Sequence, residues 1–275
     1  MIRTCDSVDL DNAIEYSWYH QTNPQTQSYP KFKSKSAFSK TLKNALCLAD
    51  YNDENDIIGF GAFMVAEDAR YIQTVAGIYT TAPFQGVLDR FVAYLKNAFP
   101  GYQLLMDFPQ SNQEALDGLD EFNAQLVDNC TVMLLDVERI PKLKQSTLHM
   151  EPLLESNEFR FKQHHDFVNP DIFWSADKIF RNKKAWFVFM ELKNKDVVSS
   201  ITLKKYNRIH AEVFSFYASM ESAYEFLNRS VRYCADQGVE DIIFFVDTED
   251  AIALASATAN GFKEQDHYYS FKLDL

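Results

Sequence analysis

Two titratable side chains, His210 and Glu212, have the types and spacing that suit proton transfer. They alternate with apolar residues in a segment that runs on through Phe214 and Phe216 to Tyr217. Alternate residues of a strand point to one face, so the first four are predicted to lie together. Glu212 can act as a general base there and Tyr217 can donate a hydrogen bond into a cleft, which makes them the candidate catalytic residues. The alternative is a solvated glutamate and a half-buried strand tyrosine.

A second candidate site is a loop that leads into an apolar helix. Gln85, Gly86 and Val87 follow a proline, and apolar residues then recur at helical spacing to Ala98. The N-terminus of a helix attracts anions, and a glycine lets its backbone N–H groups approach a phosphate closely. The sequence therefore predicts a phosphate-binding loop here, with a plain helix start that binds nothing as the alternative.

Composition narrows the class of protein. The chain has 275 residues, of which 47% are apolar, and 27 basic residues stand against 39 acidic ones for a net charge of −12. Such an acidic chain is a poor candidate for binding nucleic acid, whereas it could favour a cationic, amine-bearing substrate. We find no signal peptide and no apolar run long enough to span a membrane, so we expect a cytoplasmic protein without a membrane partner.

Cysteine and histidine residues give no metal signal. The four cysteines lie far apart without a CxxC pair, which excludes a disulfide framework or a zinc site of the usual spacing. His164 and His165 are adjacent, and no further ligand spacing supports them. We therefore expect them on a loop or at the surface, and we predict no metal.

An internal repeat is the most informative feature of the chain. Asp56 and Asp196 open matching apolar segments at a spacing of 140, and Tyr79 and Tyr217 match at a spacing of 138. The dipeptide Leu-Asp also recurs at this second spacing, at 135–136 and 273–274. A change of two residues in a loop accounts for the shift. The sequence predicts two copies of one domain, at residues 1–140 and 146–275.

Each copy is predicted to be an α/β domain with a mixed, mostly antiparallel sheet flanked by helices. Hydrophobic periodicity and capping signals place the elements. In the first copy we expect helices around 10–18, 36–44, 87–98 and from 111, and strands near 45–51, 57–66, 70–79, 103–108 and 131–137. In the second copy we expect helices at 223–234 and 248–260 and strands at 242–246 and 268–273.

The order of these elements resembles the GNAT family, the GCN5-related N-acetyltransferases, in tandem. That family often has the motif Asn-x-x-Ala-x-x-x-Tyr-x-x-x-Gly-Phe after its fifth strand. The matching positions in this sequence are Asp250, Ala253, Ala257, Gly261 and Phe262, and in the first copy Asn112, Ala115, Leu119, Asn123 and Ala124. The fourth motif position of each copy is a helix end that needs positive φ, which glycine and asparagine supply.

The resemblance implies acetyl-CoA as co-substrate. The family's pyrophosphate loop reads Gln/Arg-x-x-Gly-x-Gly/Ala, and Gln85 and Gly86 fit its opening, whereas Leu88 and Arg90 replace its later small residues. The second copy has Glu225 in this region, which would repel a phosphate. The implied cofactor-binding residues are therefore in the first copy: Ile78, Tyr79, Gln85, Gly86 and Val87.

The resemblance also implies acyl transfer from a thioester to an amine. Glu212 resembles the strand glutamate that many members use as a base, and Thr74 is expected at that position in the first copy. The motif tyrosine, which often protonates the leaving thiolate, is replaced by Leu119 and Ala257. Two hypotheses follow: a divergent N-acyltransferase that acts on a small amine or peptide amine, or a non-catalytic protein of this fold that binds a ligand or partner.

Overall fold

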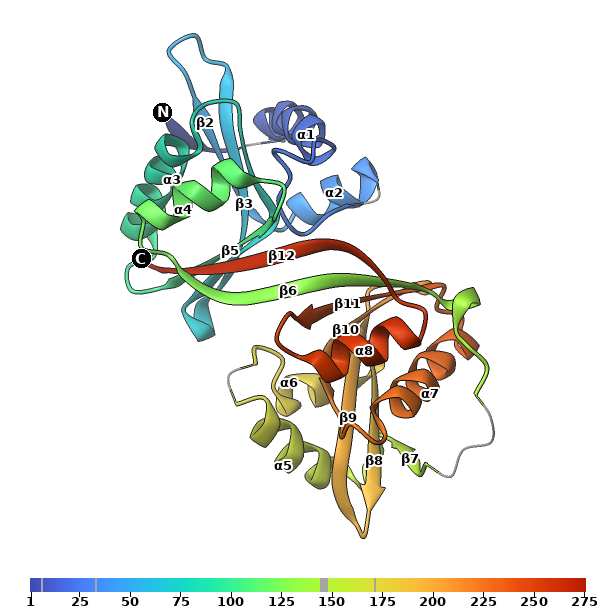
Figure 1. Ribbon diagram of the computed structural model, residues 1–275. Coiled ribbons are helices and arrows are strands. Elements are labelled where there is room, and N and C mark those ends of the chain that lie inside the picture. Colours follow the sequence, from blue (N-terminus) through green and yellow to red (C-terminus); the bar gives the residue numbers. More distant parts are fainter. Residues whose placement is uncertain (6, 33, 144–147, 171) are drawn as a thin grey trace. The chain divides into compact units, whose positions relative to one another are not determined.

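The chain forms two compact units in a computed structural model that describes residues 1–5, 7–32, 34–143, 148–170 and 172–275 (Figure 1). The first unit comprises Met1–Asn129 together with His267–Leu275, and the second comprises Cys130–Asp266. Both are mixed α/β units, as predicted.

The elements of the first half of the chain alternate as the repeat predicted. They are β1 (Ile2–Thr4), α1 (Ser7–Gln21), α2 (Lys35–Leu42), β2 (Leu46–Tyr51), β3 (Ile57–Ala66), β4 (Tyr71–Thr80), α3 (Phe84–Ala98), β5 (Gln103–Pro109), α4 (Gln113–Glu121) and β6 (Gln125–Asp136), with short 3-10 turns at Glu67–Ala69 and Val137–Arg139.

The second half repeats this order. Its elements are β7 (Met150–Pro152), α5 (Glu158–Val168), α6 (Ala176–Arg181), a 3-10 turn (Lys183–Ala185), β8 (Trp186–Lys193), β9 (Asp196–Lys205), β10 (His210–Tyr217), α7 (Ala223–Asp236), β11 (Asp241–Asp247), α8 (Ala251–Ala259) and β12 (Lys263–Asp274). His164 and His165 therefore lie on helix α5, which corrects the expectation of a loop.

Each unit takes its last strand from the other half of the chain. In the first unit β12 pairs antiparallel with β5, and Asp274 lies opposite Gln103. In the second unit β6 pairs antiparallel with β11, and Asp136 lies opposite Asp241. Gln103 and Asp241 are 138 residues apart (241 − 103), and so are Asp136 and Asp274 (274 − 136). The last strand therefore pairs in the same register in both units. The units thus differ from the expected ranges 1–140 and 146–275 because the last strands are exchanged.

Helices cover both faces of the sheet in the first unit (Figure 1). On one face, α3 and α4 pack on strand residues such as Phe63 and Ile72. On the other face, α1 and α2 bury Phe38 and Leu42 against Phe60. The amphipathic stripe of α3 that the sequence predicted is thus a core contact.

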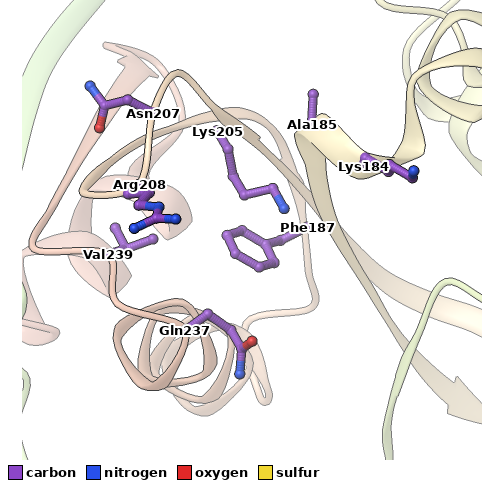
Figure 2. Close-up of a pocket in the computed structure, with 8 residues that line it drawn as sticks. All are labelled: Lys184, Ala185, Phe187, Lys205, Asn207, Arg208, Gln237 and Val239. Carbon is purple, nitrogen blue, oxygen red and sulfur yellow. The ribbon is translucent and has the colours of Figure 1, made fainter.

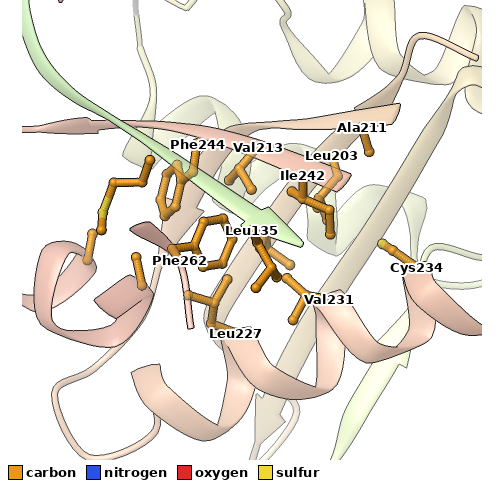
Figure 3. Close-up of a cluster of buried hydrophobic side chains, with 14 of the residues drawn as sticks. Leu135, Leu203, Ala211, Val213, Leu227, Val231, Cys234, Ile242, Phe244 and Phe262 are labelled. Carbon is orange, nitrogen blue, oxygen red and sulfur yellow. The ribbon is translucent and has the colours of Figure 1, made fainter. Parts of the chain in front are cut away.

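The second unit has the same layers. Figure 3 shows α7 residues such as Leu227 and Val231 packed on Leu203 and Val213 of the strands. On the opposite face, α5 and α6 pack against Trp186, Val188 and Met190 of β8.

Both predicted helix ends adopt the left-handed conformation. Asn123 has φ of 53° and Gly261 has φ of 90°. A Cβ at Gly261 would lie 2.9 Å from the carbonyl oxygen of Arg139, so this position also lacks room for a side chain. The physical argument for these two motif positions is confirmed.

The strand exchange predicts which unit a core mutation weakens. Phe271 and Met133 occupy equivalent positions, since Phe271 pairs with Met106 and Met133 pairs with Phe244. Phe271→Ala should destabilise the first unit by about 3–5 kcal/mol, because the large-to-small change leaves a cavity in its core. Hydrogen exchange measures this as faster exchange in β4 and β5 with β9 and β10 unchanged.

Met133→Ala is the matched variant and should reverse the pattern, with faster exchange in β9, β10 and β11. If Phe271→Ala instead loosened β9 and β10, the assignment of β12 to the first unit would be wrong.

Candidate functional site

A bulge separates the fourth strand from its parallel neighbour in each unit. In the first unit β4 pairs with β5 from Tyr71 to Gln73, which lies opposite Leu105. The register of β4 against β3 then shifts between Thr74 and Gly77. In the second unit β10 pairs with β11 from His210 to Val213, and the register against β9 shifts around Phe214. Beyond each bulge the backbone of the fourth strand must find other partners.

In the first unit the chain itself supplies these partners. The hydroxyl of Ser28 accepts a hydrogen bond from the Ile78 N–H at 3.3 Å and donates one to the Asp107 carbonyl at 3.0 Å. The Tyr29 N–H donates to the same carbonyl at 2.9 Å. A Cβ at Gly77 would lie 2.5 Å from the Cβ of Ser28. The segment at Ser28 and Tyr29 therefore lies between β4 and β5.

The other residues predicted to bind a cofactor are also engaged within the first unit. Tyr79 is fully buried and its hydroxyl donates to the side chain of Gln21. Burial raises the pKa of this hydroxyl far above its usual range. The side chain of Gln85 donates to Glu121.

The N-terminus of α3 already holds an anion from the protein. A Glu114 carboxylate oxygen accepts a hydrogen bond from the Phe84 N–H at 3.0 Å. The N–H groups of Gly86 and Val87 donate to the Pro83 carbonyl at 3.1 and 3.4 Å. A phosphate would meet a carboxylate at this position. These contacts argue against a cofactor role for Ile78, Tyr79, Gln85, Gly86 and Val87.

The register identifies the counterpart of Glu212 in the first unit. Glu212 lies opposite Ile243, and Gln73 lies opposite Leu105. Since β11 and β5 correspond at a spacing of 138 (243 − 105), Gln73 is the equivalent residue, and the expectation of Thr74 was wrong. The bulge of β4 contains one more residue than that of β10. Residues before the bulge therefore match at a spacing of 139 (212 − 73), and residues after it match at 138. An amide cannot take up a proton at neutral pH, so a base at this position exists only in the second unit.

The bulge also changes which residues of β10 share a face. Phe214 packs with Trp174 and Trp186 on the side of α5 and α6. Phe216 packs with Phe226 and Phe244 on the opposite side. The prediction that Phe216 lies with Glu212 and Phe214 was wrong, because an extra residue in a strand inverts the alternation.

The surroundings of Glu212 shift the pKa of its carboxyl group. It accepts a hydrogen bond from the Tyr206 hydroxyl at 2.6 Å, and it lies opposite Lys204 on β9. Burial raises the pKa of Glu212 to about 7, while the Tyr206 hydrogen bond and the Lys204 charge act in the opposite direction. A group with this pKa can exchange a proton at neutral pH.

Aromatic rings surround the ammonium group of Lys204. Its Nζ lies 3.8 Å from the ring centroid of Trp174, 5.6 Å from that of Phe214 and 5.9 Å from that of Trp186. Burial lowers the pKa of Lys204, and Glu212 counteracts this. The face of β10 that carries Glu212 thus has an aromatic wall that accommodates a cation.

Tyr217 lies at the end of β10 and is 48% exposed. Its ring centroid is 5.3 Å from that of His164, whose Nε2 lies 3.0 Å from the Ser200 hydroxyl. Burial lowers the pKa of His164. Between Glu212 and Tyr217, the Ser215 hydroxyl donates to the Asn169 carboxamide at 3.2 Å. His164 was considered only as a metal ligand and Asn169 was not identified, because the apolar stripe of α5 is too weak to reveal the helix.

The N-terminus of α7 also carries a carboxylate. Ala223 and Phe226 donate their N–H groups to the carbonyls of Ser219 and Ser222, at 2.9 and 2.8 Å. Glu225 lies in the first turn, and its buried Oε1 has no hydrogen-bond partner among the described residues. An unpartnered buried carboxylate oxygen disfavours an anion nearby.

Comparison with solved structures establishes the fold. A GCN5-related N-acetyltransferase from Sphaerobacter thermophilus superposes with a TM-score of 0.72 at 10% identity, over 100% of this chain and 95% of that one. A tandem GNAT protein from the clavulanic acid biosynthesis pathway gives 0.62 at 10% identity, over 100% and 98%. A GNAT-family acetyltransferase from Colwellia psychrerythraea gives 0.56 at 13% identity, over 99% of each chain.

The chain therefore has the GNAT fold, in two units. No protein-family model and no curated protein matches the sequence. Within the ranges that the structure describes, no helix is long and apolar enough to cross a membrane. No cluster of three or more potential metal ligands occurs among those same residues.

The raised pKa of Glu212 predicts a pH dependence of stability. The folded protein keeps this carboxyl protonated up to about pH 7, whereas the unfolded chain ionises it near the ordinary value of 4.5. Stability is therefore lost as pH rises between these values. Glu212→Gln removes this loss, so its stability relative to the wild type should increase from about pH 5 to about pH 8, as measured by urea unfolding.

Tyr206→Phe provides the control for the cause of the shift. Loss of its hydrogen bond should raise the pKa of Glu212 further, which carboxyl infrared bands can follow. Parallel stability curves for wild type and Glu212→Gln would contradict the assignment.

Proposed function

We propose that the protein is an N-acyltransferase whose reaction centre lies in the second unit, with acetyl-CoA as acyl donor and a small amine or peptide amine as acceptor. The observation that carries this proposal is Glu212, a carboxyl group with a pKa of about 7 placed just before the bulge of β10. The GNAT fold of the solved neighbours supports it at the level of fold.

In the proposed reaction the neutral amine attacks the carbonyl carbon of the thioester. The bond from carbon to sulfur breaks, the amine proton passes to Glu212, and the leaving thiolate takes a proton from Tyr217. Backbone N–H groups of β10 beyond Phe214 stabilise the negative charge on the carbonyl oxygen. Both candidate catalytic residues thus act from one strand.

The aromatic wall beside Glu212 supports a cationic acceptor. Trp174, Trp186 and Phe214 already surround the ammonium group of Lys204, and an acceptor amine has the same charge before it loses its proton. The net charge of −12 favours the approach of such a molecule. The reaction needs neither nucleic acid nor membrane, and we place it in the cytoplasm.

The first unit acts as a scaffold in this proposal. Gln73 replaces the base, Ser28 and Tyr29 fill the space beside β4, and Glu114 occupies the N-terminus of α3. The coenzyme would therefore bind along β10 and at the N-terminus of α7, where Glu225 weakens the affinity.

A non-catalytic binding protein is the second candidate function. The carboxylates at the N-termini of both central helices, Glu114 and Glu225, favour it, because each opposes a bound phosphate. Binding of acetyl-CoA separates the two candidates before any acceptor is known.

Calorimetry with acetyl-CoA should detect saturable binding that depends on the second unit. Glu225→Gln should tighten it about 5-fold, because removal of one like charge near the phosphates is worth about 1 kcal/mol. Gly86→Glu should leave it unchanged, and the new side chain has room, since the nearest atom to its Cβ is Arg90 Nη1 at 3.6 Å. Absence of binding at about millimolar acetyl-CoA, some −4 kcal/mol, would contradict the acyltransferase proposal.

Transfer to a panel of primary amines should then depend on Glu212. Glu212→Gln should lower the rate by about 10²–10⁴-fold, the usual contribution of a general base, with the affinity for acetyl-CoA retained. The wild-type rate should rise with pH through about 7 as Glu212 ionises. Gln73→Ala at the equivalent position of the first unit is the control and should be fully active. Equal loss in both variants would indicate a structural effect.

A further inference from the structure

A pocket of about 450 Å³ lies in the second unit on the face of the sheet that α7 covers (Figure 2). Residues from three places in the chain line it: Lys184, Ala185 and Phe187 at the start of β8, Lys205, Asn207 and Arg208 between β9 and β10, and Gln237 and Val239 after α7. Its volume is in the range of pockets that hold small molecules.

The pocket is basic in an acidic chain. Lys184, Lys205 and Arg208 are basic, and none of the described residues that line the pocket is acidic; Figure 2 shows the Lys184 amine directed away from the space that Lys205 and Arg208 face. Other lysines of this unit, such as Lys162 and Lys183, form ion pairs with carboxylates. The three cations of the pocket form no ion pair with a carboxylate in the part of the chain that the structure describes. Positive charges without a nearby carboxylate attract an anion.

The last carbonyl groups of α7 do not explain why basic residues lie in this pocket. The last carbonyls of a helix can attract positive charge. Here the carbonyls of Tyr233, Cys234 and Ala235 already accept N–H groups from residues 237–239. The charges therefore remain available to a ligand.

The first unit shows that the fold does not require this set of charges. The strand registers align Val65 with Lys205 and Lys43 with Lys184, so the first unit has no cation in place of Lys205 but has one in place of Lys184. Lys205 is thus a property of the second unit and not of the repeated domain.

We propose that this pocket binds the phosphate group of a small molecule. A guanidinium group such as that of Arg208 matches phosphate oxygens in two parallel hydrogen bonds, and Lys205 adds a point charge. The Lys205 ammonium lies 4.5 Å from the Phe187 ring centroid, so the phosphate would sit at the edge of an apolar surface that Phe187 and Val239 form. Figure 2 shows Lys205 and Arg208 directed to the space beside this ring.

This site is distinct from the proposed reaction centre. Lys205 lies against Phe187 on the face of the sheet that α7 covers, whereas Lys204, which is opposite Glu212, lies against Trp174 on the face that α5 and α6 cover. Gln237 follows α7, whose N-terminus is some 20 Å away at 1.5 Å per residue. A molecule bound in the pocket would therefore not replace the pyrophosphate of the coenzyme. The inference does not depend on the acyltransferase proposal.

Calorimetry with inorganic pyrophosphate tests the pocket on the full chain. We expect saturable binding that the double variant Lys205→Glu/Arg208→Glu weakens at least tenfold. Lys193→Glu/Lys195→Glu, on the exposed hairpin between β8 and β9, makes the same change in charge and should bind within twofold of the wild type. Absence of saturable binding at 5 mM, or equal loss in both double variants, would overturn the proposal.

Two further titrations identify the source of the phosphate and its place. Adenosine monophosphate that binds more tightly than inorganic phosphate, with adenosine alone not bound, would indicate a phosphorylated organic ligand. Equal affinities would indicate free phosphate. Competition between acetyl-CoA and pyrophosphate would overturn the assignment of a separate site, and independent binding would support it whether or not the protein transfers acetyl groups.

Discussion

The bulge in the fourth strand of each unit is the constraint on which the site depends. Parallel pairing of β4 with β5 ends at Gln73, and that of β10 with β11 ends at Val213. Backbone groups that leave a sheet need new partners, because an unsatisfied buried N–H or carbonyl is costly. In the first unit Ser28 meets this need by bonding to Ile78 and to Asp107. The space between the fourth and fifth strands of the first unit is therefore closed by the chain itself.

The strand exchange also brings two hydroxyl groups of β12 into contact with a buried carboxylate of the first unit. Asp107 is buried on β5 and accepts hydrogen bonds from Tyr268 and Ser270 of β12, at 2.8 and 2.7 Å. Burial raises its pKa to about 6, and these two hydroxyls, with the Gln73 amide, act against the shift. Gln73, the counterpart of Glu212, thus donates a hydrogen bond to a buried carboxylate. This contact explains why the first unit keeps a polar residue there without the chemistry of Glu212.

Sequence patterns predicted the elements and the repeat because hydrophobic spacing and capping are local properties. They could not reveal the exchange of β6 and β12, since Leu135-Asp136 and Leu273-Asp274 are identical and fit either sheet. The face of Phe216 was missed because a bulge leaves no signal in the alternation of residue types. The strand that carries Glu212 was predicted from local alternation and is confirmed, whereas its hydrogen bond to Tyr206 crosses a turn and left no such signal. The catalytic role of Glu212 stays a prediction.

The predicted phosphate loop illustrates how tertiary contacts override a motif. Gln85 and Gly86 have the residue types that suit an anion at a helix N-terminus, yet Glu114, 30 residues further on, supplies the anion from the protein. In an acidic chain such carboxylates are plentiful, so a helix N-terminus is readily satisfied from within. Basic residues are fewer, and a group of them without carboxylate partners is the more informative signal. By that criterion Lys205 and Arg208 point to a phosphate more strongly than the glycine of the loop does.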